Sequence, residues 1–358
     1  MQINPQIANL PTYKPGKALE EVARELNLPL ENLVKLASNE NPLGPSPKSI
    51  AAAKKALEQI HLYPDGNAFH LRNVLAEKLN IDPEQLIFGN GSNEIIEFLA
   101  HALLKPGTNI VVSQFCFAIY PIVARLAGAD CVTVPAKNYG HNLPKMAAAI
   151  TPETRIVFVA NPNNPTGTLA PKSQLLELIE NTPEDVLIVI DEAYYEYLNE
   201  PTNLLPLLKE KPNLLIMRTF SKIYGLAGLR VGYGIGHPPF IAALDKIRQP
   251  FNLNSVAQAA AIAAVEDAEH LIATRSNNSE GLNFLENNLK KLGIKTVPSF
   301  ANFILAEVGN GIEMFEKLQK RGIITRPMDG YKLPEWIRIS VGSTEENKRC
   351  IEMIEELY

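Results

Sequence analysis

The chain has 358 residues, of which 46% are hydrophobic and 20% are charged, and its formal net charge is -5. That length predicts about two domains, and the composition is ordinary for a globular protein that buries its own core. The acidic balance and the lack of a long basic run argue against nucleic acid and anionic membrane surfaces as partners. No apolar stretch of the sequence reaches the length of a membrane span.

The cysteines and the N-terminal residues indicate the cellular compartment of the protein. Cys116, Cys131 and Cys350 are scattered, and their spacing fits neither a disulfide framework nor a metal site. Residues 1–16 lack the charged start and the apolar run of a signal peptide. We therefore expect a cytoplasmic protein in a reducing compartment, without a bound metal.

The first part of the chain combines short helices with polar loops. Residues 1–16 are rich in Pro and Asn and are predicted to be extended, and 18–26 are predicted to form a short helix. The Asn- and Pro-rich segment 36–47 is typical of a loop. An Ala/Lys/Leu-rich helix at 49–59 then leads to a turn at Tyr63-Pro-Asp-Gly66.

From residue 86 onward, apolar strands alternate with helices. Strands are predicted at 86–88, 109–112, 155–160, 186–190 and 214–217, and helices at 94–104, 119–126 and 173–181. The strands are continuous apolar runs, which is the pattern of strands buried on both faces of a parallel sheet. The alternation with helices predicts an α/β fold around a central, mostly parallel sheet. Residues 232–236 form a glycine-spaced strand that indicates tight packing or a bulge.

The sequence changes character after Pro250. An Ala-rich helical region at 255–292 leads to strands at 303–305 and 337–341 and to a C-terminal helix from Glu345. We interpret this part as a smaller α+β domain. The predicted division is an N-terminal segment 1–35 that joins the small domain, a large domain 36–250, and an interdomain helix with the small domain over 251–358.

Polar clusters follow four of the predicted strands. They are Gly89–Glu94, Asn161–Gly167, Asp191–Tyr194 and Thr219–Lys222. Ligands of open α/β sheets bind beyond the carboxyl ends of the strands. The four clusters therefore predict one shared site.

Each cluster, taken alone, has a structural explanation as well as a functional one. Gly89–Glu94 opens a helix and suits a phosphate, or it is only a helix cap, since it matches neither G-x-G-x-x-G nor a Walker loop. Asp191 suits a protonated ring nitrogen, or it is a solvated strand-end acid or a metal ligand. Lys222, near hydroxyls and Arg230, is a candidate amine of lowered pKa, or an exposed loop lysine.

In combination these motifs resemble those of a known family. Asn161-Pro-Asn-Asn-Pro-Thr-Gly167, Asp191-Glu-Ala-Tyr194, Ser221-Lys222 and Gly228-Leu-Arg230 are similar in order and spacing to fold-type I, class I/II aminotransferases. Within that group the chain most resembles the histidinol-phosphate aminotransferase family. The segments that carry this second resemblance are Tyr13–Gly16, Leu36–Pro45, Tyr63–Asp65, Gly89–Ser92 and Ile337–Gly342.

The resemblance implies a fold-type I transferase fold, with pyridoxal 5'-phosphate bound by the large domain. Lys222 would hold the cofactor as an imine and serve as general base. Asp191 would pair with the pyridinium nitrogen of the cofactor and keep it protonated. Asn164 and Tyr194 would hydrogen-bond the phenolic oxygen, and Phe117 would stack on the ring.

The remaining implied roles concern phosphate and substrate. Ser92, Asn93, Ser221 and Arg230 would hold the cofactor phosphate, and Tyr63 would reach the phosphate of the partner subunit in a homodimer. Arg338 would bind the carboxylate or phosphate of the substrate, because its planar fork suits both anions. Tyr13 and Arg326 are further candidates for the substrate phosphate.

The activity implied is transamination of histidinol phosphate with 2-oxoglutarate, which gives imidazole acetol phosphate and glutamate in histidine biosynthesis. The alternatives are an aromatic aminotransferase or another fold-type I enzyme, such as a phosphothreonine decarboxylase. Two alternatives belong to other classes of protein. One is a regulator that binds the same cofactor, and the other is a dinucleotide-binding protein. The first would need a DNA-binding module, and the second lacks the required glycine pattern.

The sequence departs from the family pattern at three places. Phe115-Cys116-Phe117 stands where Pro-Thr-Tyr or Pro-Thr-Phe is usual, Asn93 replaces an acid, and Ile223 follows Lys222 where a small residue is usual. None of these changes removes an essential group. They bear on the substrate preference and on the stacking role of Phe117.

Overall fold

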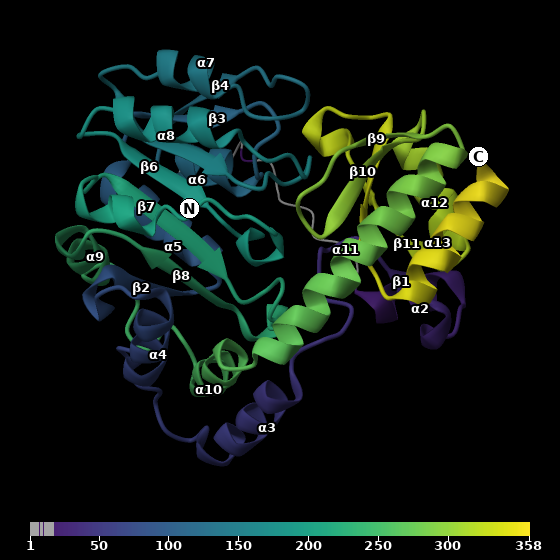
Figure 1. Cartoon of the computed structure of the whole chain (residues 1–358), viewed down its shortest axis with the longest axis horizontal. Helices are drawn as coiled ribbons and strands as arrows, with labels where there is room; N and C mark the ends of the chain where they lie inside the picture. The colour runs from purple at the N-terminus through teal and green to yellow at the C-terminus, as the bar shows by residue number, and fades with distance from the viewer. Residues whose placement is uncertain (1–6, 8–9, 11–17) are drawn as a thin grey trace, which may run out of the picture.

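A seven-stranded sheet, here called the large sheet, forms the centre of the computed structural model, which describes Ile7, Leu10 and residues 18–358. Its strand order is β2-β8-β7-β6-β5-β3-β4 (Figure 1). Strands β7, β6, β5, β3 and β4 are parallel, while β8 runs antiparallel to both β7 and β2. The strands are β2 (Leu86–Asn90), β3 (Asn109–Ser113), β4 (Asp130–Val134), β5 (Thr154–Ala160), β6 (Leu187–Asp191), β7 (Leu214–Thr219) and β8 (Val231–Ile235).

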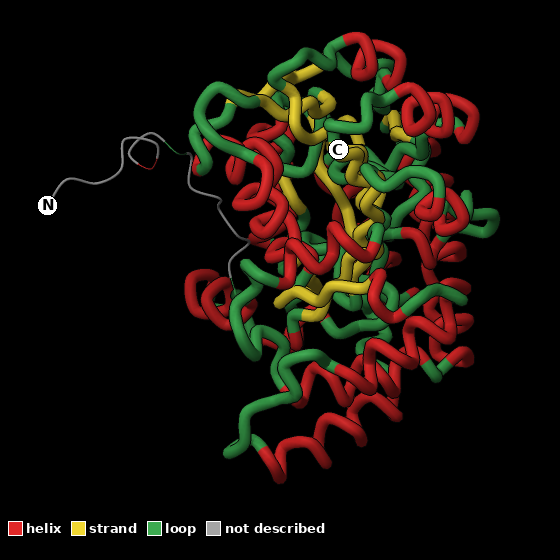
Figure 2. Tube along the Cα trace, turned by 90° about the vertical axis from the view of Figure 1, so that its left-hand side faces the viewer, coloured by secondary structure: helices red, strands yellow, loops and turns green. Residues whose placement is uncertain are grey.

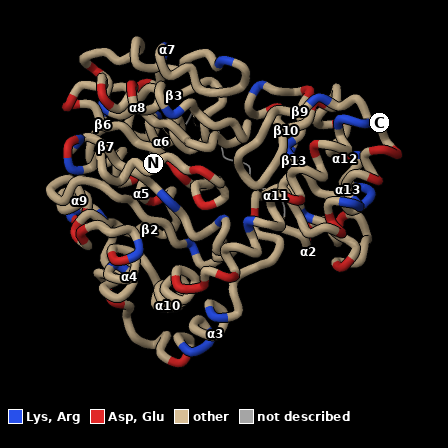
Figure 3. Tube along the Cα trace, in the orientation of Figure 1, with Lys and Arg blue, Asp and Glu red and all other residues tan. Residues whose placement is uncertain are grey.

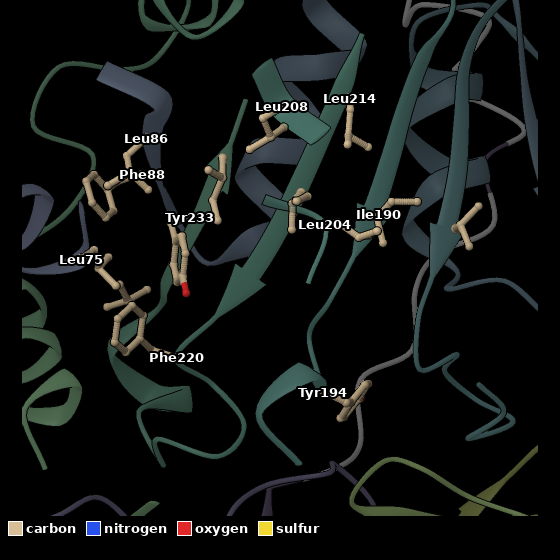
Figure 4. Close-up of a cluster of buried hydrophobic side chains, with 14 of the residues drawn as sticks. Leu75, Leu86, Phe88, Ile190, Tyr194, Leu204, Leu208, Leu214, Phe220 and Tyr233 are labelled. Carbon is tan, nitrogen blue, oxygen red and sulfur yellow. The ribbon is translucent and has the colours of Figure 1, made fainter. Parts of the chain in front are cut away.

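Apolar side chains cover both faces of the large sheet, so that helices lie on either side of the strands (Figure 2). Ile110, Phe158 and Met217 belong to the core of one face. The helices of that face are α5 (Ser92–Leu103), α6 (Ile119–Leu126) and α9 (Pro238–Asp245). Val159 and Ile190 belong to the core of the other face, part of which is drawn in Figure 4. The helices there are α4 (Phe69–Leu79), α7 (Leu143–Ala148), α8 (Lys172–Asn181) and α10 (Ser255–Val265), with α3 (Pro47–Ala56) packed on α10.

The predicted α/β fold with a mostly parallel central sheet is therefore confirmed. The strands predicted between residues 86 and 217 are present within two residues of their expected ends. Strand β4 is absent from the predicted set because it lies at the edge of the sheet, where most of its side chains are at least partly exposed and no continuous apolar run forms. The extended conformation predicted for 1–16 falls almost wholly outside the described residues.

A second, antiparallel sheet of four strands, here called the small sheet, has the order β12-β13-β10-β9. Its strands are β9 (Lys295–Val297), β10 (Phe303–Glu307), β12 (Arg326–Pro327) and β13 (Trp336–Ser340). Leu285, Ile304 and Ile339 belong to a core that this sheet shares with α11 (Ala268–Lys291), α12 (Gly311–Lys320) and α13 (Thr344–Leu357). Helix α11 runs from the end of α10 towards the small sheet (Figure 1).

Two smaller features complete the fold. Helix α2 (Leu19–Leu26) precedes β1 (Val34–Lys35), which pairs in parallel with β11 (Ile323–Ile324). The Ala-rich region predicted to be helical over 255–292 consists of two helices, because the Asp267 side chain accepts the amide hydrogen of His270 and caps a new helix there. None of the described helices is long and apolar enough to cross a membrane.

Charges of both signs are spread over the whole molecule (Figure 3), and most of them lie at the surface. The pair Arg218–Glu192 is an exception, since both side chains are buried and the guanidinium contacts the carboxylate at 2.8 Å. The guanidinium carbon also lies 3.7 Å from the centre of the Tyr195 ring. The pair joins β7 to the residue that follows β6.

We expect Arg218→Met to lower the free energy of unfolding by about 3–5 kcal/mol, because it leaves the Glu192 carboxylate buried without its cation. Urea unfolding followed by circular dichroism measures this. The matched control is Lys317→Met, which breaks the exposed pair Lys317–Glu313 and should leave the free energy nearly unchanged. Equal effects of the two substitutions would contradict the role given to the buried pair.

Candidate active site

A cavity of about 270 Å³ opens at the carboxyl ends of the parallel strands, where the small sheet faces the large one. Strands β5, β6 and β7 run the same way, so the residues after each of them meet at one edge. The small sheet closes the other side of the cavity. The predicted site residues that line the cavity are Ser92, Asn93, Phe117, Asn164, Asp191, Tyr194, Ser221, Lys222, Arg230, Arg326 and Arg338.

Lys222 supplies an amine to the cavity from the segment just after β7. Burial lowers the pKa of this amine to about 8, and the positive charges of Arg338 and Arg230 act in the same direction. Glu40 and Asp191 oppose the shift without cancelling it. An amine with such a pKa is partly unprotonated near neutral pH, and the unprotonated form attacks carbonyl carbons.

Asp191 is the last residue of β6 and is buried, with 6% of its surface exposed. Its Oδ2 accepts a hydrogen bond of 2.7 Å from the Tyr120 hydroxyl, and its Oδ1 accepts one of 3.2 Å from the Ala193 amide. Burial raises the pKa of this carboxyl group, while the two hydrogen bonds and Lys222 hold it down. A carboxylate held away from water attracts a cationic partner, and a protonated ring nitrogen in the cavity is such a partner.

The start of α5 forms an anion-binding cradle, made of Ser92, Asn93, Ser221 and Arg230. The N-cap of α5 is Gly91, which has no side chain to bond the free N–H groups of the first turn. The Arg230 guanidinium lies 3.4 Å from the Ser221 hydroxyl oxygen, and the Arg230 carbonyl accepts a hydrogen bond from the Gly91 amide. Backbone N–H groups, hydroxyls and a guanidinium together suit a phosphate.

Two glycines allow this cradle to form. Gly91 has φ +80°, and a Cβ there would lie 2.2 Å from a terminal nitrogen of Arg230. A Cβ on Gly232 would lie 2.2 Å from the amide nitrogen of Ser92. The tight packing predicted for the glycine-spaced strand 232–236 is thus present, and it brings β8 against the start of α5.

Hydrogen bonds from the small sheet and from the loop after β1 fix the groups opposite the cradle. Arg338 donates bonds of 2.7 Å to the Asn164 side-chain oxygen and to the Ala37 carbonyl. Asn39 donates a bond of 2.9 Å to the Tyr194 hydroxyl oxygen, and burial raises the pKa of Tyr194 to about 12. The N–H groups of Asn164 and the hydroxyl hydrogen of Tyr194 therefore remain as donors for an acidic oxygen.

Of the three remaining predicted residues, one lines the cavity. Phe117 lines the cavity and meets the Tyr120 ring edge to face at 5.7 Å. Tyr63 does not line the cavity; it is 83% exposed and its ring stacks on Phe251 with 4.8 Å between ring centres. Tyr13 lies outside the described residues.

Several residues around the cavity were not among the predicted site residues, and Asn39, Tyr120 and Tyr331 are the ones with side chains that bear on the site. Asn39 lies within the polar loop 36–47, so its surroundings in the sequence did signal an unusual segment. Tyr120 lies on a helix of ordinary apolar pattern, and Tyr331 lies in a short turn of the small sheet. Only the folded arrangement connects these two residues with the site.

Comparison with known proteins identifies the family. The sequence pattern described as aminotransferase class I and II matches residues 31–354. The chain therefore belongs to the class I and II aminotransferase family. The curated histidinol-phosphate aminotransferase of Akkermansia muciniphila is 48% identical over 355 residues, which cover 99% of this chain and 98% of that protein.

Solved structures agree on the fold. The histidinol-phosphate aminotransferase of Sinorhizobium meliloti, solved in complex with pyridoxal 5'-phosphate, superposes with a TM-score of 0.90 at 28% identity, covering 100% of this chain and 98% of that one. The aspartate aminotransferase of Thermus thermophilus with maleate superposes with a TM-score of 0.85 at 25% identity, covering 100% of both chains. The predicted fold-type I transferase fold is thereby confirmed.

We expect Gly91→Ala to weaken the binding of pyridoxal 5'-phosphate by about tenfold or more, because the new methyl group displaces the Arg230 guanidinium from the cradle. Fluorescence titration of the apo-protein measures the dissociation constant. Gly107→Ala is the matched control, since Gly107 also has a positive φ, +85°, but has open space around it. Similar losses in both variants would mean that backbone strain, not the cradle, is responsible.

We expect the rate at which pyridoxal 5'-phosphate attaches to the apo-protein to rise with pH around a midpoint near 8, because only the neutral Lys222 amine reacts with the aldehyde. Arg338→Met removes a positive neighbour and should move the midpoint upwards. Stopped-flow absorbance measures both profiles. A wild-type midpoint near that of a free lysine would refute the lowered pKa.

Proposed function

We propose that the protein transfers an amino group from glutamate to imidazole acetol phosphate and, in reverse, from histidinol phosphate to 2-oxoglutarate, with pyridoxal 5'-phosphate as cofactor. The observation that carries the proposal is the convergence of Lys222, Asp191 and the anion-binding cradle in one cavity. The histidinol-phosphate aminotransferase of A. muciniphila, similar over nearly the whole chain, supports the choice of substrate and a role in histidine biosynthesis.

The cavity offers a partner for each polar group of the cofactor. The cradle at the start of α5 would hold the phosphate, and Lys222 would join the aldehyde carbon. Asp191 would face the ring nitrogen and keep it protonated, because an opposite charge nearby favours the charged form. Asn164 and Tyr194 would donate to the phenolic oxygen, and Phe117 would cover one face of the ring.

When bound, the cofactor supplies an electron sink that stabilises negative charge on the substrate α-carbon. The chain itself supplies the proton transfers. Lys222, with its lowered pKa, would take the proton from the substrate α-carbon as general base and deliver it to the former aldehyde carbon of the cofactor. Asp191 would keep the ring nitrogen protonated, and Tyr194, with its raised pKa, would serve as a hydrogen-bond donor.

The substrate end is formed by two arginines of the small sheet. Arg326 and Arg338 are direct partners across β12 and β13, so their side chains lie on the same face of the sheet. Both line the cavity, and Arg338 is held by Asn164 and Ala37. We propose that Arg338 binds in turn the glutamate carboxylate and the phosphate of histidinol phosphate. Arg326 and Tyr13 are further candidates for the phosphate.

An exposed apolar surface next to Tyr63 supports a homodimer. Leu57, Ile60, Leu62 and Tyr63 are between 52% and 83% exposed, and Phe251, which stacks on Tyr63, is 45% exposed. A group of large apolar side chains in water is typical of an interaction surface. We propose that a second copy covers it and that Tyr63 reaches the cofactor phosphate of that copy.

Two further proposals concern the organisation of the chain and its compartment. Residues 36–250 would form the cofactor-binding domain, and 251–358 the interdomain helix and small domain, which the N-terminal segment 1–35 joins. The contact of Val22 and Leu33 with Ile324 supports that arrangement. The free cysteines Cys116, Cys131 and Cys350 support a cytoplasmic location.

We expect the purified protein with pyridoxal 5'-phosphate to convert histidinol phosphate and 2-oxoglutarate to glutamate, and Lys222→Ala to reduce the rate by at least about 10²-fold. A coupled glutamate assay measures this. Lys145→Ala, at an exposed lysine, is the control and should be unaffected. Turnover of phenylalanine without turnover of histidinol phosphate would overturn the substrate assignment, and an undiminished Lys222→Ala would overturn the site.

A further inference from the structure

Tyr120 is the closest side-chain partner of the Asp191 carboxylate within the described part of the chain. Its hydroxyl donates to Asp191 Oδ2 at 2.7 Å, which is the length of a well-formed O–H···O hydrogen bond. Tyr120 lies in α6 and Asp191 ends β6, so the bond joins a helix covering the large sheet to the base of the cavity. Tyr120 itself does not line the cavity.

The Tyr120 ring cannot turn away from this bond. It is fully buried, and it stacks on Phe158 of β5 with 4.4 Å between ring centres and 6° between planes. Phe117, on the cavity side, meets it edge to face. Packing on both sides therefore fixes where the hydroxyl points, and the donor is in place before any ligand arrives.

The carboxylate needs such a donor. Asp191 is buried, and among the described residues its other oxygen accepts the longer bond from the Ala193 amide. Lys222 is the cation that acts on it, but that amine carries a lowered pKa and is assigned to the aldehyde of the cofactor. Among the described residues, Tyr194, Glu192 and Cys116 also act on Asp191 or Tyr120, and none of them brings a positive charge. Arg338 and Arg230 line the same cavity, but neither is a hydrogen-bond partner of Asp191 among the described contacts.

We propose that Tyr120 is a positioning residue that holds the Asp191 carboxylate ionised and directed at the cofactor ring nitrogen. The inference rests on the proposed function, since it concerns how the site binds the cofactor. The hydrogen bond from Tyr120 should raise the affinity for some ligands and not for others. A ligand with a protonated ring nitrogen benefits from the ionised carboxylate, whereas a ligand with carbon at that place does not.

The test compares pyridoxal 5'-phosphate with its 1-deaza analogue, in which a carbon atom replaces the ring nitrogen. For Tyr120→Phe we expect an affinity for pyridoxal 5'-phosphate about tenfold lower, while the affinity for the analogue stays the same or rises. In an Asp191→Asn background the same substitution should leave the ratio of the two affinities unchanged. Equilibrium titration of apo-protein gives these values without any activity measurement.

Tyr197→Phe is the matched control. It removes the hydroxyl of another buried tyrosine, whose partner is the side chain of Asn302, and it should leave the ratio of affinities unchanged. If Tyr120→Phe does not fold, 3-fluorotyrosine at position 120 replaces it, because fluorine strengthens the donor with little change in size. The ratio in favour of pyridoxal 5'-phosphate should then increase.

The outcomes separate this proposal from the proposed function. Equal losses for both ligands in Tyr120→Phe, or no loss for either, would overturn the role of Tyr120 while leaving the cofactor assignment intact. An unchanged ratio of the affinities for the two ligands in the protein with 3-fluorotyrosine at position 120 would also overturn the role of Tyr120. A wild-type protein that does not bind pyridoxal 5'-phosphate at all would instead overturn the proposed function.

Discussion

The arrangement of the site depends on keeping one carboxylate charged although it is almost wholly buried. Asp191 ends a strand that is buried on both faces, so its charge is stabilised only by the groups that the fold brings to it. The Tyr120 hydroxyl and the Ala193 amide approach from the protein side, and the cavity lies on the other. The protonated ring that we propose for that cavity would complete the set of partners.

Hydrogen bonds between the two sheets fix the other side chains of the cavity in the same way. Arg338 bonds to Asn164 of the large sheet's loop and to Ala37 after β1, so one guanidinium ties together three parts of the chain. Ser340, two residues on, exchanges hydrogen bonds with Asn39, which in turn bonds Tyr194. The small sheet thus sets the position of groups that belong to the large one, and the substrate that we propose for Arg338 would meet a site already in place.

The sequence predicts the part of this structure that depends on local pattern. Continuous apolar runs gave the parallel strands, and the polar residues that end them gave the members of the cavity, from Asn164 to Lys222. Tyr120 and Tyr331 show the limit. Nothing in the apolar pattern of α6 marks one tyrosine as the partner of a residue 71 positions later, and Tyr331 lines the cavity only because the short turn between β12 and β13 lies beside it. Contacts of this kind depend on tertiary packing, which local sequence does not encode.

Aminotransferases with different substrates share this fold, so we expect a few side chains to determine which substrate binds. An aspartate aminotransferase superposes on this chain almost as well as a histidinol-phosphate aminotransferase does, so the architecture alone does not separate their substrates. The groups that we propose for the cofactor ring follow strands of the large sheet, whereas Arg326, Tyr331 and Arg338 line the cavity from the small one. We therefore expect substrate preference to depend on β12, β13 and the turn between them. Because the charge of Arg338 also lowers the pKa of Lys222, a substitution of Arg338 would affect the proposed chemistry as well, whereas a change at Tyr331 would leave Lys222 and Asp191 in place.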